Sequence, residues 1–376
     1  MCAMNEVSKI ANSVLLLPIK IVNDRSCFEK GFQDEWSNKV ANAVSDLTVL
    51  IRNCTFLEEE WAKNSQELLP LLILCGEHSV SSEWNSQKTV NNVKDLLQLL
   101  LSKLHFQTIQ DIFALEGVAC FALQQLKPKL GKNQIKQFPA AVNCFIWVIT
   151  NTMLPAVIDE SIDFAVPVSL VLFDDWEPEY QKKGLECLQH ILNLNPKSLL
   201  QRGWIAVIFS ALKKNVGYSD KLSLYKCLDI CLKAQNSNPD DPQQWNQDDQ
   251  YDSLASDVLN SMIIQDSSAV VSCNLKILTI LFHSMKIKMA KFLPSIISLL
   301  DNYVTVGVSS DVHVLATEIT EQMIEYCWVC LDPQFTNQLT WILFKLAQEK
   351  LIDEATKMKI VKLQEMLKSL STPSTC

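Results

Sequence analysis

Four carboxylates lie within one short turn and are the strongest candidates for chemistry in this sequence. Asp174, Asp175, Glu177 and Glu179 fall between two apolar runs in "LVLFDDWEPEYQKKGLECLQHIL", residues 170–192. Neighbouring carboxylates can hold a divalent cation or divide the roles of acid and base. A carboxylate at a helix start also accepts hydrogen bonds from unpaired backbone N–H groups and suits the positive end of the helix dipole.

The other residues of this turn favour a helix corner over a reaction centre. Pro178 is typical of the first position of a helix, where its missing N–H costs nothing. Lys183 is expected to pair with an aspartate of its own or a neighbouring turn. Trp176 is a large aromatic side chain in a polar loop, as in many partner-binding surfaces. The turn is therefore interpreted first as a capping corner, second as a docking surface, and only third as a catalytic or metal site.

Known catalytic signatures do not occur elsewhere in the chain, so neither a cofactor nor a metal is expected. The sequence has no glycine-rich phosphate loop, no His-Glu-x-x-His and no Gly-x-Ser-x-Gly. "CWVC", Cys327 to Cys330, has redox-like spacing, but it falls near the end of a helical pattern without a preceding strand. The five histidines are scattered singly, and His190 and His283 are predicted to be packed or edge residues of helices rather than ligands.

The net charge, the apolar runs and the cysteines of the sequence limit the class of protein to which the chain can belong. The formal net charge of −9 argues against nucleic acid as a partner, because backbone binding depends on clustered Lys and Arg. No apolar run approaches the ~18 residues that cross a bilayer, so no membrane is expected. The first residues do not follow the pattern of a secretory signal, because Glu6 lies in the charged region and Pro18 and Lys20 interrupt the apolar run. A reducing, intracellular location is therefore predicted. Many of the 13 cysteines lie in apolar helical runs, where free Cys acts as a small hydrophobe: Cys120, Cys144, Cys187, Cys227, Cys231 and Cys273.

Length and periodicity predict an all-α protein built from stacked helices. The 376 residues exceed the ~250–300 at which single cores stop growing, so the chain is multidomain or a solenoid. Only 8 glycines occur. Apolar residues repeat at helical spacing in Tyr180–Leu192, in Leu275–Phe282, in Leu293–Leu300 and in the amphipathic stretch Leu351–Leu370. No strand alternation is convincing.

Three segments share one pattern, a proline followed by an apolar helix and a polar corner. They run from Pro167 to Asp174, from Pro294 to Asp301 and from Pro70 to Gly76. The first leads into a helix with a basic and a small residue, Lys183 and Gly184, an order that resembles the HEAT repeat. Stacked helix pairs of this kind bury each other's faces. We therefore expect an α-solenoid of degenerate HEAT/armadillo-like repeats.

Composition shifts divide the predicted solenoid. Residues 1–233 form the N-terminal and central repeats, residues 253–370 the C-terminal repeats, and residues 371–376 a tail. Residues 234–252, "AQNSNPDDPQQWNQDDQYD", are predicted to be a polar flexible loop because they contain almost no aliphatic side chain. Residues 76–89 are expected to connect two helices, and the basic stretch Leu126–Lys136 to be a solvated loop between helices.

From Leu170 to Leu212 the sequence resembles the family of the second TEL-two-interacting protein. The resemblance rests on an Asp-Asp corner, a basic-Gly-Leu helix, a Leu-x-x-x-Gly segment and an apolar helix ending in Ala-Leu. The matching positions are Asp174, Asp175, Glu177, Pro178, Tyr180, Lys183, Gly184, Leu199, Gly203, Phe209, Ala211 and Leu212. The chain departs from the family at "KKNVGYSDKLS", where a proline-containing stretch is usual.

This resemblance implies a non-enzymatic scaffold in the TTT co-chaperone complex. The implied partners are the TEL-two protein and the first TEL-two-interacting protein. With the ninety-kilodalton heat-shock chaperone and its R2TP adaptor, that complex matures and stabilises phosphatidylinositol-3-kinase-related kinases, which act in the DNA damage response and TOR signalling. The implied location is cytoplasmic and nuclear. The alternatives are another HEAT-type scaffold, of the transport-receptor or phosphatase-subunit type, and a helical enzyme with a metal at the acidic corner.

Overall fold

A computed structural model describes residues 2–23, 25–53, 65–215, 220–235, 250–264, 267–305, 309–349 and 352–371. The predicted all-α fold is confirmed, with one exception that sequence periodicity missed. A short antiparallel hairpin, β1 (Lys20–Val22) and β2 (Arg25–Cys27), pairs Ile21 with Ser26. The chain divides into two compact units, an N-terminal unit (Met1–Trp204) and a C-terminal unit (Ile205–Cys376).

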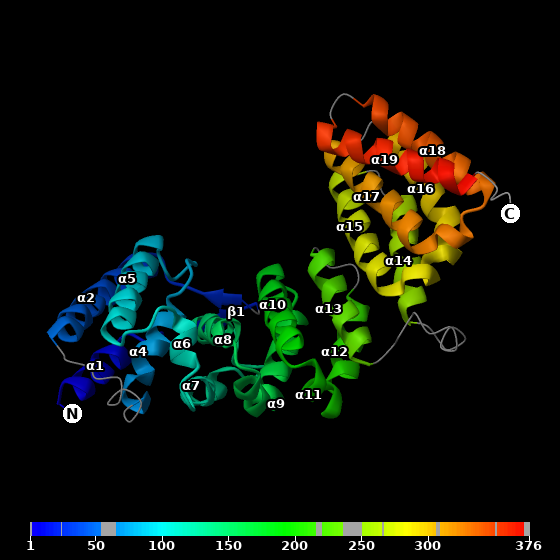
Figure 1. The fold of residues 1–376 in the computed structure, drawn as a ribbon. Helices are drawn as coiled ribbons and strands as arrows, with labels where there is room; N and C mark the ends of the chain where they lie inside the picture. The colour runs from blue at the N-terminus through cyan, green and yellow to red at the C-terminus, as the bar shows by residue number, and fades with distance from the viewer. Residues whose placement is uncertain are drawn as a thin grey trace. The chain divides into compact units, whose positions relative to one another are not determined.

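The N-terminal unit is a stack of helices that also contains this hairpin. Its helices are α1 (Cys2–Ser13), α2 (Phe32–Asn53), α4 (Ser65–Glu77), α5 (Gln87–Lys103), α6 (Ile109–Phe113), α7 (Val118–Leu126), the 3₁₀ turn η1 (Lys127–Lys129), α8 (Pro139–Asn151), α9 (Pro155–Phe173), α10 (Pro178–Leu194) and α11 (Pro196–Gln201). Packing joins α1 to α4, α2 to α5, α4 to α8, and α9 to α10 (Figure 1). The core lies between these helices, so each helix buries one apolar stripe.

The C-terminal unit repeats this arrangement without a sheet among its described residues. Its elements are α12 (Trp204–Lys214), α13 (Lys221–Ala234), α14 (Gln250–Ile264), α15 (Ser268–Met285), η3 (Lys286–Phe292), α16 (Leu293–Thr305), α17 (Ser310–Cys327), η4 (Trp328–Cys330), α18 (Pro333–Gln348) and α19 (Glu354–Ser371). Helix α15 packs on α13, α14 and α17, and α18 packs on α16 and α19 (Figure 1).

Polar contacts between successive helix pairs reveal the length of the repeat. His190 Nε2 lies 2.9 Å from the Thr152 carbonyl oxygen, 38 positions earlier. Lys345 Nζ donates to Asp301 Oδ1 over a separation of 44 positions. Other such bonds fall between these limits in both units. This spacing agrees with the ~40–47 residues of a HEAT or armadillo unit and confirms the predicted stacking of helical repeats.

The predicted opening of helices by proline is right at one place and wrong at two. Pro294 is the second residue of α16. Pro167 instead lies inside α9, which begins at Pro155, and Pro70 lies inside α4. Helix α4 also continues through Gly76 to Glu77, and α16 continues through Asp301 to Thr305, so neither helix ends at the predicted polar corner. An interior proline forfeits one backbone hydrogen bond. Tertiary packing of the long apolar stripes offsets that loss, which sequence pattern alone does not reveal.

The predicted connections fall in part outside the described residues. Of the polar loop 234–252, residues 236–249 lie outside them, while its last residues are helical because α14 begins at Gln250. The boundaries drawn around this loop stay predictions. Residues 76–89 connect α4, which ends at Glu77, to α5, which begins at Gln87. Of the predicted tail, Ser371 belongs to α19 and residues 372–376 lie outside the described residues.

One stretch is longer and more apolar than the sequence analysis allowed. Ser268–Val304 meets the length and hydropathy of a membrane span, a test that the core helices of soluble proteins also pass. Its first part is α15, which buries Leu275, Leu278 and Phe282 among the neighbouring helices. Packing within the C-terminal unit therefore accounts for the apolar character of α15.

Candidate functional site

The acidic turn is the corner between α9 and α10. Helix α9 ends at Phe173, and the Asp174 N–H donates to the Leu170 carbonyl at 2.9 Å. Pro178 is the first residue of α10, as predicted. Asp175 Oδ1 accepts a hydrogen bond from the Glu177 N–H at 2.9 Å, which closes a tight turn ahead of the helix. Asp175 thus shapes the corner itself, while the Asp174 side chain is exposed.

Lys136 is the centre of this corner, and sequence analysis did not select it. Its Nζ lies 3.1 Å from Asp175 Oδ1 and 2.9 Å from Glu177 Oε1. The Lys136 side chain is only 7% exposed, so the prediction that Leu126–Lys136 is a solvated loop is wrong at its end. Burial acts to lower the pKa of Lys136, but hydrogen bonds and charges from Glu177 and Asp175 outweigh it and raise that pKa. Two carboxylates therefore hold this lysine charged.

Two cations lie over the Trp176 ring at the same corner. Arg25 Cζ is 4.5 Å and Lys136 Nζ 4.8 Å from a Trp176 ring centroid. Both distances suit cation–π attraction. Trp176 keeps 49% of its surface exposed. Because Arg25 belongs to β2, the indole links the hairpin to the α9–α10 corner.

Backbone contacts strengthen the link between the hairpin and Lys136. Ser26 Oγ donates to the Lys136 carbonyl oxygen at 2.5 Å, and the Ile19 N–H donates to the Gln137 carbonyl at 2.8 Å. Tyr180 is buried beneath the corner, with Lys136 Nζ 5.7 Å from its ring. Burial raises the pKa of Tyr180 to about 12 against the opposing effect of a hydrogen bond with Ser26. We call Arg25, Lys136, Asp175, Trp176 and Glu177 the corner cluster.

The remaining predicted residues on α10 and beyond have structural contacts. Lys183 pairs with Glu179 at 2.5 Å rather than with an aspartate, because Glu179 lies one helical turn earlier on the same face. Gly184 faces α9, where a Cβ would meet the Phe173 nitrogen at 2.4 Å and the Ser169 oxygen at 2.6 Å. Gly203 has a left-handed φ of 77° in the turn before α12, where an L side chain is disfavoured.

The carboxylates of the corner cluster are engaged in ion pairs. Lys136 engages Asp175 and Glu177, and among the described residues no three His, Cys, Asp or Glu side chains converge to hold a metal. The "CWVC" pair follows the helical course that was predicted. Cys327 ends α17 and is buried, whereas Cys330 is exposed in η4. Burial raises the pKa of Cys327 to about 12, the reverse of what a reactive thiol needs.

The histidines singled out in the sequence also have packing roles. His190 bonds to the Thr152 carbonyl. His283 Nδ1 lies 2.9 Å from the Tyr326 hydroxyl, and its Nε2 lies 3.1 Å from Gln322 Nε2. These bonds join neighbouring repeats within the C-terminal unit. His190 is partly buried on α10 and His283 is exposed on α15, in agreement with the predicted packed or edge positions.

Three residues of the corner were missed by sequence reasoning: Arg25, Ser26 and Lys136. One signal for Lys136 was available. It precedes Phe138–Pro139, the start of a helix, in a stretch whose Ile135 is apolar. Two carboxylates in a partly buried turn also require a cation. Arg25 and Ser26 gave no comparable signal, because the hairpin that presents them is too short for alternation to be visible.

Comparisons with known proteins support the resemblance. No family model matches the chain. Three curated proteins, each named TELO2-interacting protein 2, are 27% identical in human, 26% in rat and 27% in mouse. Each match covers 169 residues, or 43% of this chain and 33% of the relative. The matched part is thus one third of the relatives' length.

A solved structure agrees with the fold. The crystal structure of Kap121p superposes on 97% of this chain and 34% of that protein, with a TM-score of 0.52 and 14% sequence identity. At this identity the likeness concerns the fold alone. It places the chain among helical solenoid proteins, in agreement with the predicted fold class.

Proposed function

The chain is a relative of the TELO2-interacting protein 2 family, and from this premise we propose that it is a non-enzymatic scaffold subunit of a TTT-type co-chaperone complex. Its direct partners are the TEL-two protein and the first TEL-two-interacting protein. The observation that carries this proposal is the sequence match to three mammalian proteins of that name. A stack of helical repeats supports it, because such stacks offer long surfaces to several proteins at once.

The finer parts of the proposal concern what the complex does. With the ninety-kilodalton heat-shock chaperone and R2TP, it assists the maturation of phosphatidylinositol-3-kinase-related kinases in the cytoplasm and nucleus. Neither nucleic acid nor membrane takes part in this role. The described geometry is compatible with a scaffold, since the carboxylates of the corner cluster are engaged by Lys136.

We place one docking point at the exposed side of the α9–α10 corner. Asp174 is exposed, and Trp176 keeps half of its surface accessible while Arg25 and Lys136 contact its ring. A rigid, half-exposed tryptophan beside an acidic group suits a protein interface, because it loses little conformational freedom on binding.

The first test is a tagged purification of this chain from its own cells, read by mass spectrometry. Recovery of the TEL-two and first-interacting subunits with a large kinase is the expected result. Recovery of transport cargo or phosphatase subunits would assign the chain to another class of HEAT-type scaffold. Recovery of no stable partner would overturn the TTT assignment.

A pair of charge reversals tests the docking point. Asp174→Lys is expected to reduce recovery of the subunits without changing the melting temperature, because Asp174 is exposed. Glu116→Lys is the matched control, since Glu116 is an exposed acid in the turn between α6 and α7. Equal recovery with both variants would remove the corner from the interface. Asp174→Asn and Asp175→Asn are expected to alter partner binding or stability. Loss of a catalytic activity, with the fold and the partner binding retained, would favour an enzyme.

A further inference from the structure

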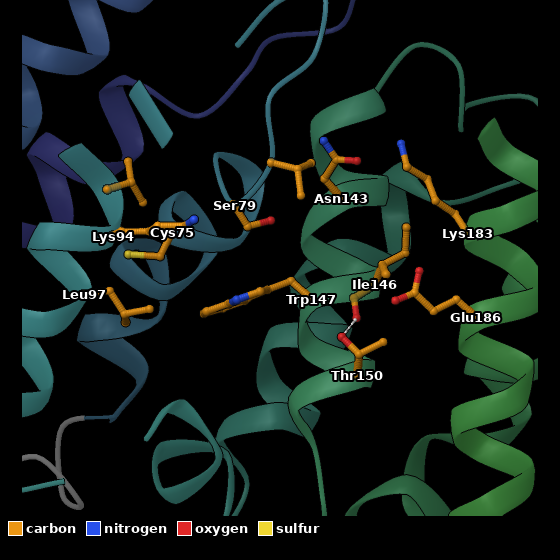
Figure 2. A pocket seen from close by; sticks show the side chains of 12 residues that line it. Cys75, Ser79, Lys94, Leu97, Asn143, Ile146, Trp147, Thr150, Lys183 and Glu186 are labelled. Atoms are coloured by element: carbon orange, nitrogen blue, oxygen red, sulfur yellow. Dashed lines mark hydrogen bonds between the residues drawn. The ribbon is translucent and has the colours of Figure 1, made fainter. Parts of the chain in front are cut away.

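A pocket of about 350 Å³ lies in the N-terminal unit, apart from the corner cluster. Three helices supply most of its lining (Figure 2). Leu97 comes from α5, Ile146 and Trp147 from α8, and Glu186 from α10. The pocket is partly open to solvent and has mainly apolar walls. It is large enough for one or two big apolar side chains, and its openness suits a protein segment better than an enclosed small molecule.

Trp147 forms the apolar floor of this pocket. Its ring packs edge-on against Phe113, with the ring centroids 5.2 Å apart. This contact supports the indole ring. In Figure 2 the indole extends from α8 toward Leu97. A fixed aromatic surface of this kind binds an apolar side chain at small entropic cost.

Charged side chains flank the pocket on both sides, Lys94 on α5 and Lys183 and Glu186 on α10. Lys94 on α5 is exposed, and Glu186 on α10 is exposed as well. Lys183, also on α10, is already paired with Glu179. Figure 2 shows Trp147 between Lys94 on one side and Lys183 and Glu186 on the other. A segment that fits these charges carries an acidic residue toward α5 and a basic residue toward α10.

Asn143 adds an independent sign that the pocket takes a ligand. Its side chain is buried, with 4% of its surface exposed, and it lines the pocket. Asn143 Oδ1 accepts no hydrogen bond from the described residues. A buried carbonyl oxygen without a donor is costly, and a bound N–H or O–H group would remove that cost.

From these observations we infer that the pocket binds a linear segment of another protein. A large apolar side chain of the segment lies on Trp147 between an acidic residue at Lys94 and a basic residue at Glu186. A hydrogen-bond donor of the segment reaches Asn143 Oδ1. This inference does not rest on the proposed function, because the test uses the purified chain alone.

The test is selection from a phage-displayed library of random linear peptides on the purified full chain. The expected peptides place a large apolar residue between an acidic and a basic residue. With the double variant Lys94→Glu/Glu186→Lys, the order of the two charges in the selected peptides is expected to reverse. Absence of selected peptides, or the same charge order with both proteins, would overturn the inference.

A control variant separates local from general charge effects. Lys88→Glu/Glu116→Lys makes the same exchange at exposed positions outside the pocket lining. It should select the same peptides as the unmodified chain. Reversal of the charge order by this variant would overturn the assignment to the pocket.

Asn143→Leu provides a second readout that a merely structural residue would not give. A fluorescein-labelled selected peptide should bind about tenfold more weakly, as expected for one lost buried hydrogen bond. The melting temperature of the free chain should stay equal or rise, because the substitution removes an unpaired buried oxygen. Unchanged peptide affinity with a lower melting temperature would show that Asn143 only supports the fold.

Discussion

Two corners of this molecule share a sequence pattern and differ in how they are stabilised. Both were predicted as a polar corner after a proline and an apolar helix, and at each an aspartate pairs with a lysine close to a tryptophan. Asp175 lies in the turn after α9, whereas Asp301 lies within α16, which continues to Thr305. In the N-terminal unit, Lys136 is 7% exposed and contacts both Asp175 and Glu177. In the C-terminal unit, Lys345 is 25% exposed and lies 2.8 Å from Asp301, which is 47% exposed. Lys136 is also nearer its tryptophan, at 4.8 Å from Trp176 against 5.5 Å from Trp341.

The difference shows that the pattern fixes neither the end of the helix nor the strength of the ion pair. A partly buried lysine has lost water and depends on its carboxylates, whereas an exposed pair gains little because water and salt compete with it. The hairpin covers part of this site in the N-terminal unit, since Ser26 bonds to the Lys136 backbone and Arg25 lies over the Trp176 ring. One corner is therefore a fixed element of the fold, and the other is a surface contact.

The largest effect is expected from Gly184→Ala, because the first corner also depends on close helix packing. The new Cβ would overlap the backbone of Phe173 and Ser169, which cannot move aside as a side chain can. We expect the free energy of unfolding to fall by about 3 kcal/mol, the upper range for overpacking. Urea denaturation measures this value. Helix α17, which follows the second corner, contains no glycine.

Gly203→Ala is the matched control for this substitution. Its φ of 77° is unfavourable for alanine, but an added Cβ meets no described atom within 4 Å. The expected loss is about 1 kcal/mol from backbone strain alone. A loss at Gly203 as large as that at Gly184 would contradict the role given to the α9–α10 contact.

Lys136→Met is expected to lower the free energy of unfolding by about 2 kcal/mol. The substitution leaves Asp175 and Glu177 facing each other without their cation. The value lies below the ~3–5 kcal/mol of a fully buried pair because both carboxylates reach solvent in part. Adding Asp175→Asn and Glu177→Gln should restore part of the loss. Urea denaturation of the single and triple variants checks this, and failure of the rescue would show that lost packing rather than unpaired charge dominates.

These two corners also show what sequence reasoning can reach. The end of α9 and the start of α10 were predictable, because the Asp-Asp pair and Pro178 act on their own backbone. The position of Lys136 was not predictable, because this residue lies 41 positions from Glu177 in the sequence. The position of Pro167 inside α9 was also missed, because packing of the whole stripe outweighs a local signal. Local chemistry was thus predictable, and contacts between repeats were not.

Trp176→Ala should have a smaller effect on stability and a larger one on binding. Loss of cation–π contacts with Arg25 and Lys136 is expected to cost about 1 kcal/mol. Trp341→Ala is the control, since Trp341 has similar exposure, at 54%, and lies near Lys345. Only Trp176→Ala is expected to reduce recovery of the TEL-two subunit in a tagged purification. Equal recovery with both variants would limit Trp176 to a role in the fold.

The smallest effect, and the sharpest contrast between the corners, is expected from Lys345→Met. Its exposed pair with Asp301 contributes less than about 1 kcal/mol. At 1 M salt the screening length falls to about 3 Å, so this contribution should disappear from urea denaturation curves. The cost of Lys136→Met should persist at high salt, because salt reaches a largely buried ammonium group poorly. If salt abolished both effects equally, the two corners would be surface ion pairs of one kind, and burial by the hairpin would have no energetic consequence.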